Sequence, residues 1–264
     1  MKIATSYRSY NGESYTRWID EVAAVGIRHM EIAVPELPSE PSMREEIFRY
    51  ARAKGFALNL HAPYGVNNIS SMDEECRLSS IANMKLAIDI AAEHSLGVVT
   101  FHPGRRSPEE TGSQENYERM LEAVGEIADY AKQRQVRVGI ENMEVRPNEY
   151  IHTVEDMNGF SRFAEGNPYF GVTFDFGHYA SLGKGLPPLD TLTLPLVDVH
   201  LSRYFGTRAH SALITEDADE LAEITRLLRE YGYDGFVVLE VGDGVFESIE
   251  VLRKVLASVN EVAE

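Results

Sequence analysis

The sequence predicts one α/β domain over residues 1–264, folded as a closed (β/α)₈ barrel. Eight short strand-like segments alternate with helical segments along the whole chain, a pattern typical of a parallel sheet covered by helices. The length of 264 residues fits the roughly 250 residues of such a barrel. Polar side chains follow successive strand segments, and this fold gathers the carboxyl ends of its strands at one mouth. These three observations favour the barrel.

The strand segments are short apolar runs that end at proline, glycine or polar residues. His29–Val34 is closed by Pro35, and Phe56–Leu60 begins directly after Gly55. The full set of expected strands is Ile3–Ser6, His29–Val34, Phe56–Leu60, Gly97–Phe101, Val136–Ile140, Phe170–Phe174, Val197–Leu201 and Phe236–Leu239.

The helical segments carry apolar residues three or four positions apart, which indicates one buried face. Trp18, Ile19 and Val22 lie on such a face, and Gly26 ends that segment. The expected helices are Tyr15–Val25, Pro41–Lys54, Glu74–His94, Asn116–Arg134, Val154–Ala164, a short one near Tyr179–Leu182, Asp219–Tyr231 and Ser248–Val259. An open doubly wound sheet is the alternative, but the glycine-rich dinucleotide fingerprint that it usually carries is absent from Ser6–Gly12.

Composition narrows the class of protein. Hydrophobic residues make up 44% and charged residues 25%, which is typical of a globular protein. The one cysteine, Cys76, excludes an intramolecular disulfide. Lys plus Arg is 25 and Asp plus Glu is 42, so the net charge is −17, which disfavours nucleic acids and anionic membranes as partners.

Targeting signals are not visible in the sequence. The first residues, Met1–Tyr7, lack the apolar core of a signal peptide, and no apolar run approaches the roughly 20 residues that cross a bilayer. We therefore expect a cytoplasmic protein with no membrane contact, and a homo-oligomer remains open.

Ligand-type side chains end six consecutive strand segments. They are His61, His102, Glu141, Asp175, His200 and Glu240. Strand ends converge at one mouth of a barrel, and carboxylates packed there repel one another unless a cation lies between them. Imidazole and carboxylate together suit a divalent metal such as zinc, manganese, cobalt or iron. The sequence therefore predicts a metal site.

Other barrel chemistries fit less well. A His-x-His pair is missing at the first strand, where Thr5-Ser6-Tyr7 stands, so an amidohydrolase-type metal site is disfavoured. The strand ends carry no lysine for a Schiff base, and the chain contains no Gly-x-Ser-x-Gly nucleophile motif.

Six motifs in order resemble those of the xylose isomerase-like barrel superfamily, which includes sugar isomerases and epimerases, inosose dehydratases and endonuclease IV. The motifs are His-Ala-Pro at 61–63, His-Pro-Gly at 102–104, Glu-Asn at 141–142, Asp-x-x-His at 175–178, His-Leu-Ser at 200–202 and a final strand-end Glu240. The resemblance covers essentially the whole chain and implies a TIM barrel that binds Mn, Zn, Mg or Co.

The resemblance also implies roles for individual residues. Glu141, Asp175, His200 and Glu240 match the four metal ligands of the isomerases and epimerases, among which Glu141 and Glu240 would move protons. His61 and His102, sharing Glu141, match a second metal site of the endonuclease IV branch.

The match to endonuclease IV is incomplete. His178 and His210 match residues that hold a third zinc in that branch, but Arg208 stands where its aspartate is expected. Arg203 replaces an acidic residue that often follows His-Leu-Ser. We therefore expect His178, His210, Arg203 and Arg208 to contact substrate instead, with the two arginines facing a carboxylate or phosphate.

The leading hypothesis is metal-dependent isomerisation or epimerisation of a small sugar, sugar phosphate or polyol derivative through an enediolate. Three alternatives stay open: hydrolysis of a phosphodiester in abasic DNA, dehydration by an inosose dehydratase-like lyase, and a metal-binding barrel without catalytic activity. Pocket-lining roles are expected for side chains in the loops after the first and third strands, namely Tyr7, Tyr10, Tyr64, Asn67 and Asn68. For Glu31, a structural hydrogen bond is favoured over catalysis.

Overall fold

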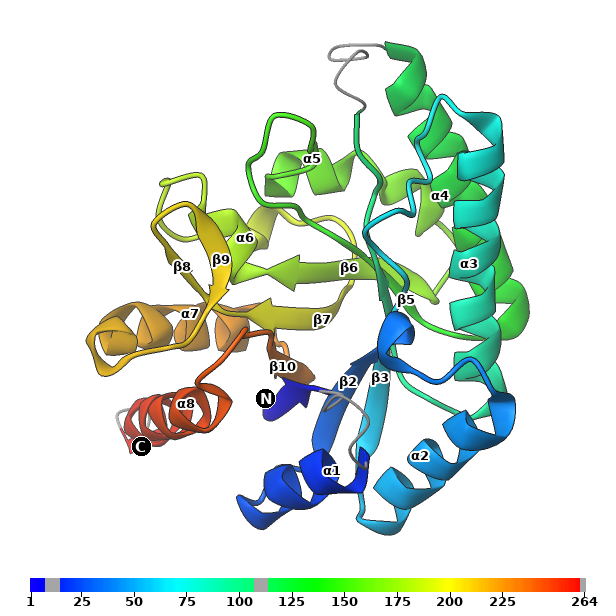
Figure 1. The fold of residues 1–264 in the computed structure, drawn as a ribbon. Helices are drawn as coiled ribbons and strands as arrows, with labels where there is room; N and C mark the ends of the chain where they lie inside the picture. Colours follow the sequence, from blue (N-terminus) through cyan, green and yellow to red (C-terminus); the bar gives the residue numbers. More distant parts are fainter. Residues whose placement is uncertain (8–14, 107–113, 262–264) are drawn as a thin grey trace.

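Eight parallel strands close into a barrel with helices outside it, in a computed structural model that describes residues 1–7, 15–106 and 114–261 (Figure 1). Around the barrel the strands follow the order β1-β10-β7-β6-β5-β4-β3-β2, and β1 pairs with both β2 and β10. The predicted (β/α)₈ barrel is confirmed.

Tyr10, one of the expected pocket residues, lies outside the described residues.

The barrel strands are close to the predicted ones and differ by one or two residues at their ends. They are β1 Lys2–Ser6, β2 His29–Ala33, β3 Ala57–His61, β4 Val99–Phe101, β5 Val138–Glu141, β6 Phe170–Asp175, β7 Leu196–Leu201 and β10 Phe236–Leu239.

The helices form the outer layer in Figure 1, where α3 and α4 lie side by side. They are α1 Tyr15–Ala24, α2 Pro41–Ala53, α3 Glu74–Glu93, α4 Gln114–Arg134, α5 Val154–Asn158, α6 Phe176–Ala180, α7 Ala218–Tyr231 and α8 Val245–Glu261. Among the described helices, none is both long and apolar enough to cross a membrane.

Three predicted helices differ by at least three residues at one end from those observed. The helix expected over Ser248–Val259 is α8, which begins earlier, at Val245, and ends later, at Glu261. The expected helix Val154–Ala164 ends at Asn158, before the poor helix former Gly159, and a 3₁₀ turn follows at Ser161–Phe163. The short helix predicted near Tyr179–Leu182 is α6, which begins at Phe176 because the side chain of Asp175 accepts a hydrogen bond from the backbone N–H of His178 (2.7 Å).

An antiparallel hairpin was not predicted. Strands β8 (Arg203–Phe205) and β9 (Arg208–Ser211) extend from the end of β7 (Figure 1). Gly206, in a left-handed conformation with φ +68°, lies in the two-residue turn. The hairpin places His210 beside the barrel mouth, where its backbone N–H donates to Ser202 Oγ (3.0 Å).

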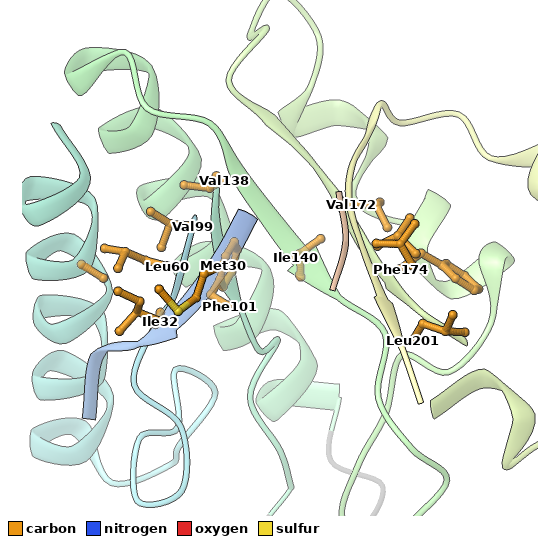
Figure 2. Close-up of a cluster of buried hydrophobic side chains, with 14 of the residues drawn as sticks. Met30, Ile32, Leu60, Val99, Phe101, Val138, Ile140, Val172, Phe174 and Leu201 are labelled. Atoms are coloured by element: carbon orange, nitrogen blue, oxygen red, sulfur yellow. The ribbon is translucent and has the colours of Figure 1, made fainter. Parts of the chain in front are cut away.

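Side chains alternate between the two sides of each barrel strand. Figure 2 shows the apolar set, which includes Leu60, Ile140 and Phe174, all fully buried. Their neighbours in sequence, His61 and Glu141 among them, carry the ligand-type groups. The same alternation therefore supplies an apolar layer and a polar barrel interior.

Polar contacts cross the interior of the barrel. Thr100 Oγ1 on β4 lies 2.9 Å from Thr173 Oγ1 on β6, although β5 stands between the two strands. Gly139 on β5 leaves room for this contact, since a Cβ there would collide with Thr173 Oγ1. Asn59 on β3 donates to Asp198 Oδ2 on β7. Such barrels are usually filled with bulky aliphatic side chains, so the polar filling is a feature of this chain.

Candidate metal centre

Four ligand-type side chains meet where the strands end. Glu141 ends β5, Asp175 ends β6, His200 lies in β7, and Glu240 follows β10. One ligand atom from each lies within 4.8 Å of those of the other three. Glu141, Asp175 and His200 are fully buried, and the Glu240 side chain is 28% exposed. The structure thus brings together the four residues that the sequence predicts as metal ligands.

His200 lies between the carboxylates. Its Nδ1 is 3.1 Å from Glu141 Oε1 and 3.0 Å from Glu240 Oε2, and its Nε2 is 3.2 Å from Glu31 Oε2. Burial disfavours the charged imidazole, but Glu31 and Glu141 raise the pKa of His200 well above its usual range. Without a cation, a proton on this imidazole offsets the carboxylate charge.

The pKa values of Glu141 and Glu240 shift in the opposite direction, below their usual range. Burial disfavours their charge, but His200 and His102 hold the pKa of Glu141 well below its usual range. For Glu240, the hydrogen bond and charge of His200 outweigh burial and lower the pKa to about 2. Both side chains are therefore ionised at neutral pH.

Asp175 supplies the observation that fits a cation. Its Oδ1 caps α6, but its Oδ2 is buried and has no hydrogen-bond partner among the residues that the structure describes. A buried carboxylate oxygen without a donor is costly, unless a cation contacts it. Burial, together with Glu141 and Glu240, raises the pKa of Asp175. One imidazole and three carboxylates form a donor set that suits Mn²⁺, Mg²⁺, Zn²⁺ or Co²⁺.

The predicted second group also assembles. Nε2 of His61 and Nε2 of His102 lie 3.3 and 3.1 Å from Glu141 Oε2. Burial lowers the pKa of His61, but its hydrogen bond to Glu141 and the nearby carboxylates raise it to about 9. Glu141 is thus shared between this group and the four-ligand group.

His178 and His210 meet beside Asp175. Their Nε2 atoms are 3.3 Å apart, while Nδ1 of His178 faces the backbone oxygen of Asn142 and Nδ1 of His210 faces that of Glu240. His210 holds a left-handed φ of +63°, which is uncommon for a residue with a side chain. Both imidazoles therefore direct Nε2 toward the mouth.

Arg203 and Arg208 lie on the hairpin. Arg203 Nε is 3.1 Å from Asp217 Oδ1, and its guanidinium stacks over Phe205. Arg208 is exposed at the start of β9. Neither arginine lines the two hollows described below. The expected contact of these arginines with substrate therefore stays a prediction.

Two hollows open at the mouth, with volumes of about 280 and 350 Å³. Both are lined by His61, Tyr64, His210 and Glu240, so they adjoin at the ligand cluster. Their size suits a small ligand, at the lower end of the roughly 300–1,000 Å³ of ligand pockets.

Of the expected pocket residues, Tyr7 and Tyr64 line the smaller hollow. Asn67 and Asn68 line neither hollow; Asn68 instead bonds the backbone of Arg105.

Two residues support the ligand cluster: Asn142, to which the sequence analysis gave no role of its own, and Glu31, for which it expected a structural hydrogen bond. Asn142 accepts from the Asp175 N–H (2.8 Å) and donates to the Asp175 carbonyl (2.9 Å), which fixes the strand end. Glu31 lies within β2, not at its end, and makes the contact to His200, which agrees with the expected structural hydrogen bond. The signal for Glu31 is an acidic residue in an otherwise apolar strand.

Comparison with known proteins places the chain in a family. The family model of the xylose isomerase-like TIM barrel matches residues 19–255. The chain belongs to this family. The resemblance inferred from the motifs is thereby confirmed.

Relatives of this xylose isomerase-like barrel differ in what is known of them. An uncharacterised protein of Methanocaldococcus jannaschii is 28% identical over 221 residues, covering 78% of this chain and 72% of that protein. A probable endonuclease 4 of Acholeplasma laidlawii is 26% identical over 149 residues, covering 55% of this chain and 50% of the other.

Solved structures share the fold along the full chain. A D-tagatose 3-epimerase-like protein superimposes with a TM-score of 0.80 at 22% identity, covering 100% of both chains. D-psicose 3-epimerase from Clostridium cellulolyticum H10, solved with D-tagatose, has a TM-score of 0.76 at 21% identity, covering 97% of this chain and 92% of that one. The second of these structural neighbours is a sugar 3-epimerase, and the first is described as similar to one.

Metal affinity is expected to rise with pH. At neutral pH the raised pKa keeps a proton on the His200 imidazole, and a metal ligand must be neutral, so binding releases that proton. Release of one proton strengthens binding about tenfold per pH unit below that pKa. Calorimetry of Mn²⁺ binding at pH 6.5, 7.0 and 7.5, in buffers of different ionisation enthalpy, measures the affinity and the number of protons released. Affinity that is flat or falls with pH contradicts this assignment of His200.

Glu31 is expected to orient His200 for metal binding. A carboxylate that contacts the far nitrogen of a ligating imidazole fixes its orientation, and losing such a partner typically costs about 10–100-fold in metal affinity. Glu31→Gln should lower Mn²⁺ affinity by that factor, while the matched change Glu223→Gln, at an exposed position of α7, leaves it unchanged. Equal affinity in both variants would remove Glu31 from this role.

Proposed function

We propose that the chain is a divalent-metal-dependent epimerase or isomerase of a small sugar or sugar derivative. The observation that carries the proposal is the convergence of Glu141, Asp175, His200 and Glu240 beside the two hollows. These four residues would hold the metal. When bound, the cation supplies electrostatic stabilisation of negative charge that develops on neighbouring substrate oxygens.

Two carboxylates would move protons. Glu141 on β5 and Glu240 after β10 are separated around the barrel by β6 and β7, so they approach the mouth from different sides. Their lowered pKa values keep them ionised, as a general base requires. In an epimerisation, one would remove the proton next to the substrate carbonyl and the other would return a proton to the opposite face.

Histidines and a tyrosine support the substrate. The Nε2 atoms of His178 and His210 are free of backbone bonds and face each other, so they can exchange hydrogen bonds with substrate hydroxyls. Tyr64 stacks on His102, with ring centroids 5.9 Å apart, and lines the larger hollow from the loop after β3.

Proton exchange tests this function. The Mn²⁺-loaded protein is incubated with ketohexoses in ²H₂O, and the products are followed by NMR. The proposal expects one deuterium at the carbon whose configuration changes, and Glu141→Gln should remove exchange while Glu223→Gln keeps it. A dehydrated product would indicate a lyase, and absence of exchange with every sugar and sugar derivative would reject the proposal.

A second candidate function is metal-dependent hydrolysis of a phosphodiester. The cluster of His61, His102 and Glu141 favours it, since two metals bridged by a carboxylate can activate water and bind phosphate. The partial match to a probable endonuclease 4 supports it further. We expect no cleavage of abasic DNA; cleavage that is lost in His102→Ala would overturn the epimerase proposal.

A further inference from the structure

Arg105 is a cation that lines the larger hollow. Its Nη2 donates to the backbone oxygen of Gly65, and both residues line the hollow. Within the part of the chain that the structure describes, no carboxylate lies within 4.0 Å of its guanidinium. Arg146, in the same hollow, is instead neutralised by Glu144, with Nε 2.7 Å from Oε2.

The backbone of Arg105 is held by the neighbouring loop. Its N–H donates to Asn68 Oδ1 (2.9 Å), while its carbonyl accepts from Asn68 Nδ2 (2.8 Å) and Ser70 Oγ (3.0 Å). Gly104 precedes it with φ +90°, and a Cβ there would lie 2.6 Å from Ser70 Oγ. These hydrogen bonds and the close approach at Gly104 therefore hold the turn before Arg105 in a single backbone conformation.

Buried polar groups support this turn from beneath. Ser70 is fully buried, and its carbonyl accepts from Asn116 Nδ2 on α4. The Asn68 N–H donates to the buried Ser80 Oγ on α3 (2.7 Å). Two helices and two loops thus fix the backbone position of one arginine, which contributes to the preorganisation that a binding group needs.

We propose that Arg105 binds an anionic group, a phosphate or a carboxylate, carried by the substrate away from its reacting carbon. The proposal rests on the proposed function, because that function assigns the hollow to a sugar. His61, His210 and Glu240 line the same hollow next to the metal ligands, so one molecule can reach both the cluster and Arg105. A guanidinium offers several N–H donors in one plane, which suits phosphate or carboxylate oxygens.

Glu149 lines the same hollow and sets the strength of this site. It makes no ion pair with Arg105 within 4.0 Å, but its charge lies close enough to interact with that of Arg105. The site accordingly favours an anion less than an isolated guanidinium would, and Glu149→Gln should tighten binding of an anionic substrate.

Substrate kinetics test the proposal. The Mn²⁺-loaded protein is assayed with a ketose, with the same ketose phosphorylated at its terminal carbon, and with a sugar acid. Arg105→Gln should raise KM for the preferred anionic substrate about 10- to 100-fold, as expected for lost charge-assisted hydrogen bonds, and leave the neutral ketose within about twofold. Arg105→Lys should restore part of the affinity. Equal losses on neutral and anionic substrates would overturn the proposal.

Binding of inorganic phosphate tests Arg105 without turnover. Calorimetry on the Mn²⁺-loaded protein should detect phosphate binding that weakens at least about tenfold in Arg105→Gln. The control Arg134→Gln removes the same charge beside Asp89, on the outer layer, and should bind as the parent does. Phosphate binding that is absent, or equal in all three proteins, rejects the anion site even if epimerisation is found. The two failures can be told apart. Absence of deuterium exchange with every sugar rejects the proposed function, whereas the phosphate measurement still shows whether Arg105 binds an anion.

Discussion

Glu240→Gln is expected to lower kcat about 10²- to 10⁴-fold, the usual contribution of a general base. The glutamine has the same shape and keeps an oxygen toward His200, but its amide cannot take a proton. The parent carboxylate is ionised, since His200 holds its pKa at about 2 despite burial. Turnover of a ketose at saturating Mn²⁺ measures the effect.

A metal-binding measurement and a control variant show whether the effect of Glu240→Gln is specific to proton transfer. Mn²⁺ stoichiometry, measured by calorimetry, should stay at the parent value, because the amide oxygen remains a ligand-type atom. Glu223→Gln, a change of the same kind at an exposed position of α7, should keep full activity. Full activity in Glu240→Gln would exclude Glu240 as a base.

Asp175→Asn is expected to remove metal-dependent activity. The Oδ2 atom is buried, and no donor from residues 1–7, 15–106 or 114–261 bonds to it, so a cation is the natural partner for its charge. Loss of a partner outside the ligand shell already costs about 10–100-fold in affinity, and loss of a ligand should cost at least about 100-fold. Calorimetry of Mn²⁺ binding measures this loss.

Asparagine is chosen at 175 because it preserves the fold. Asn caps helices as well as Asp, so the bond from the His178 N–H should survive. Thermal unfolding without metal should therefore match the parent, whereas stabilisation by Mn²⁺, about 2.7 kcal/mol at 100 times Kd in the parent, should largely disappear. Asp89→Asn, at the surface pair with Arg134, serves as the control. Unchanged Mn²⁺ stabilisation in Asp175→Asn contradicts the ligand assignment.

The barrel and its ligand cluster were predictable because they follow from simple periodicities. Apolar runs such as Phe170–Phe174 predict strands, and the order of strands and helices predicts the closed sheet. Once that sheet is assumed, Asp175 and His200 must approach each other, since each stands at the end of a neighbouring strand.

The supporting residues were not predictable in the same way. A structural hydrogen bond was expected for Glu31, but the sequence did not give its partner. Glu31 and Asp198 lie inside strands, and the sequence does not say that both flank His200. Burial and Glu31 raise the pKa of Asp198 to about 7, a property that depends on contacts across the barrel. The start of α6 was misplaced because its cap is Asp175, a residue that first reads as a ligand.

The hairpin shows why substrate contacts were hard to assign. Its strands are three and four residues long and contain two arginines, so they carry too weak a pattern for a strand prediction. The same hairpin turns Arg203 toward Asp217 while it brings His210 over Glu240. Neighbouring residues thus reach different surroundings, and only the three-dimensional arrangement separates them.

Anomalous diffraction from crystals of the Mn²⁺-loaded protein tests the central claim most directly. The proposal predicts one anomalous peak among Glu141, Asp175, His200 and Glu240, with the ion bound to all four side chains. In the cluster of His61, His102 and Glu141, the two histidines would then contact the substrate or offset the negative charge of Glu141. Two or three peaks that include His61 and His102 would contradict the single-metal epimerase and favour phosphodiester hydrolysis.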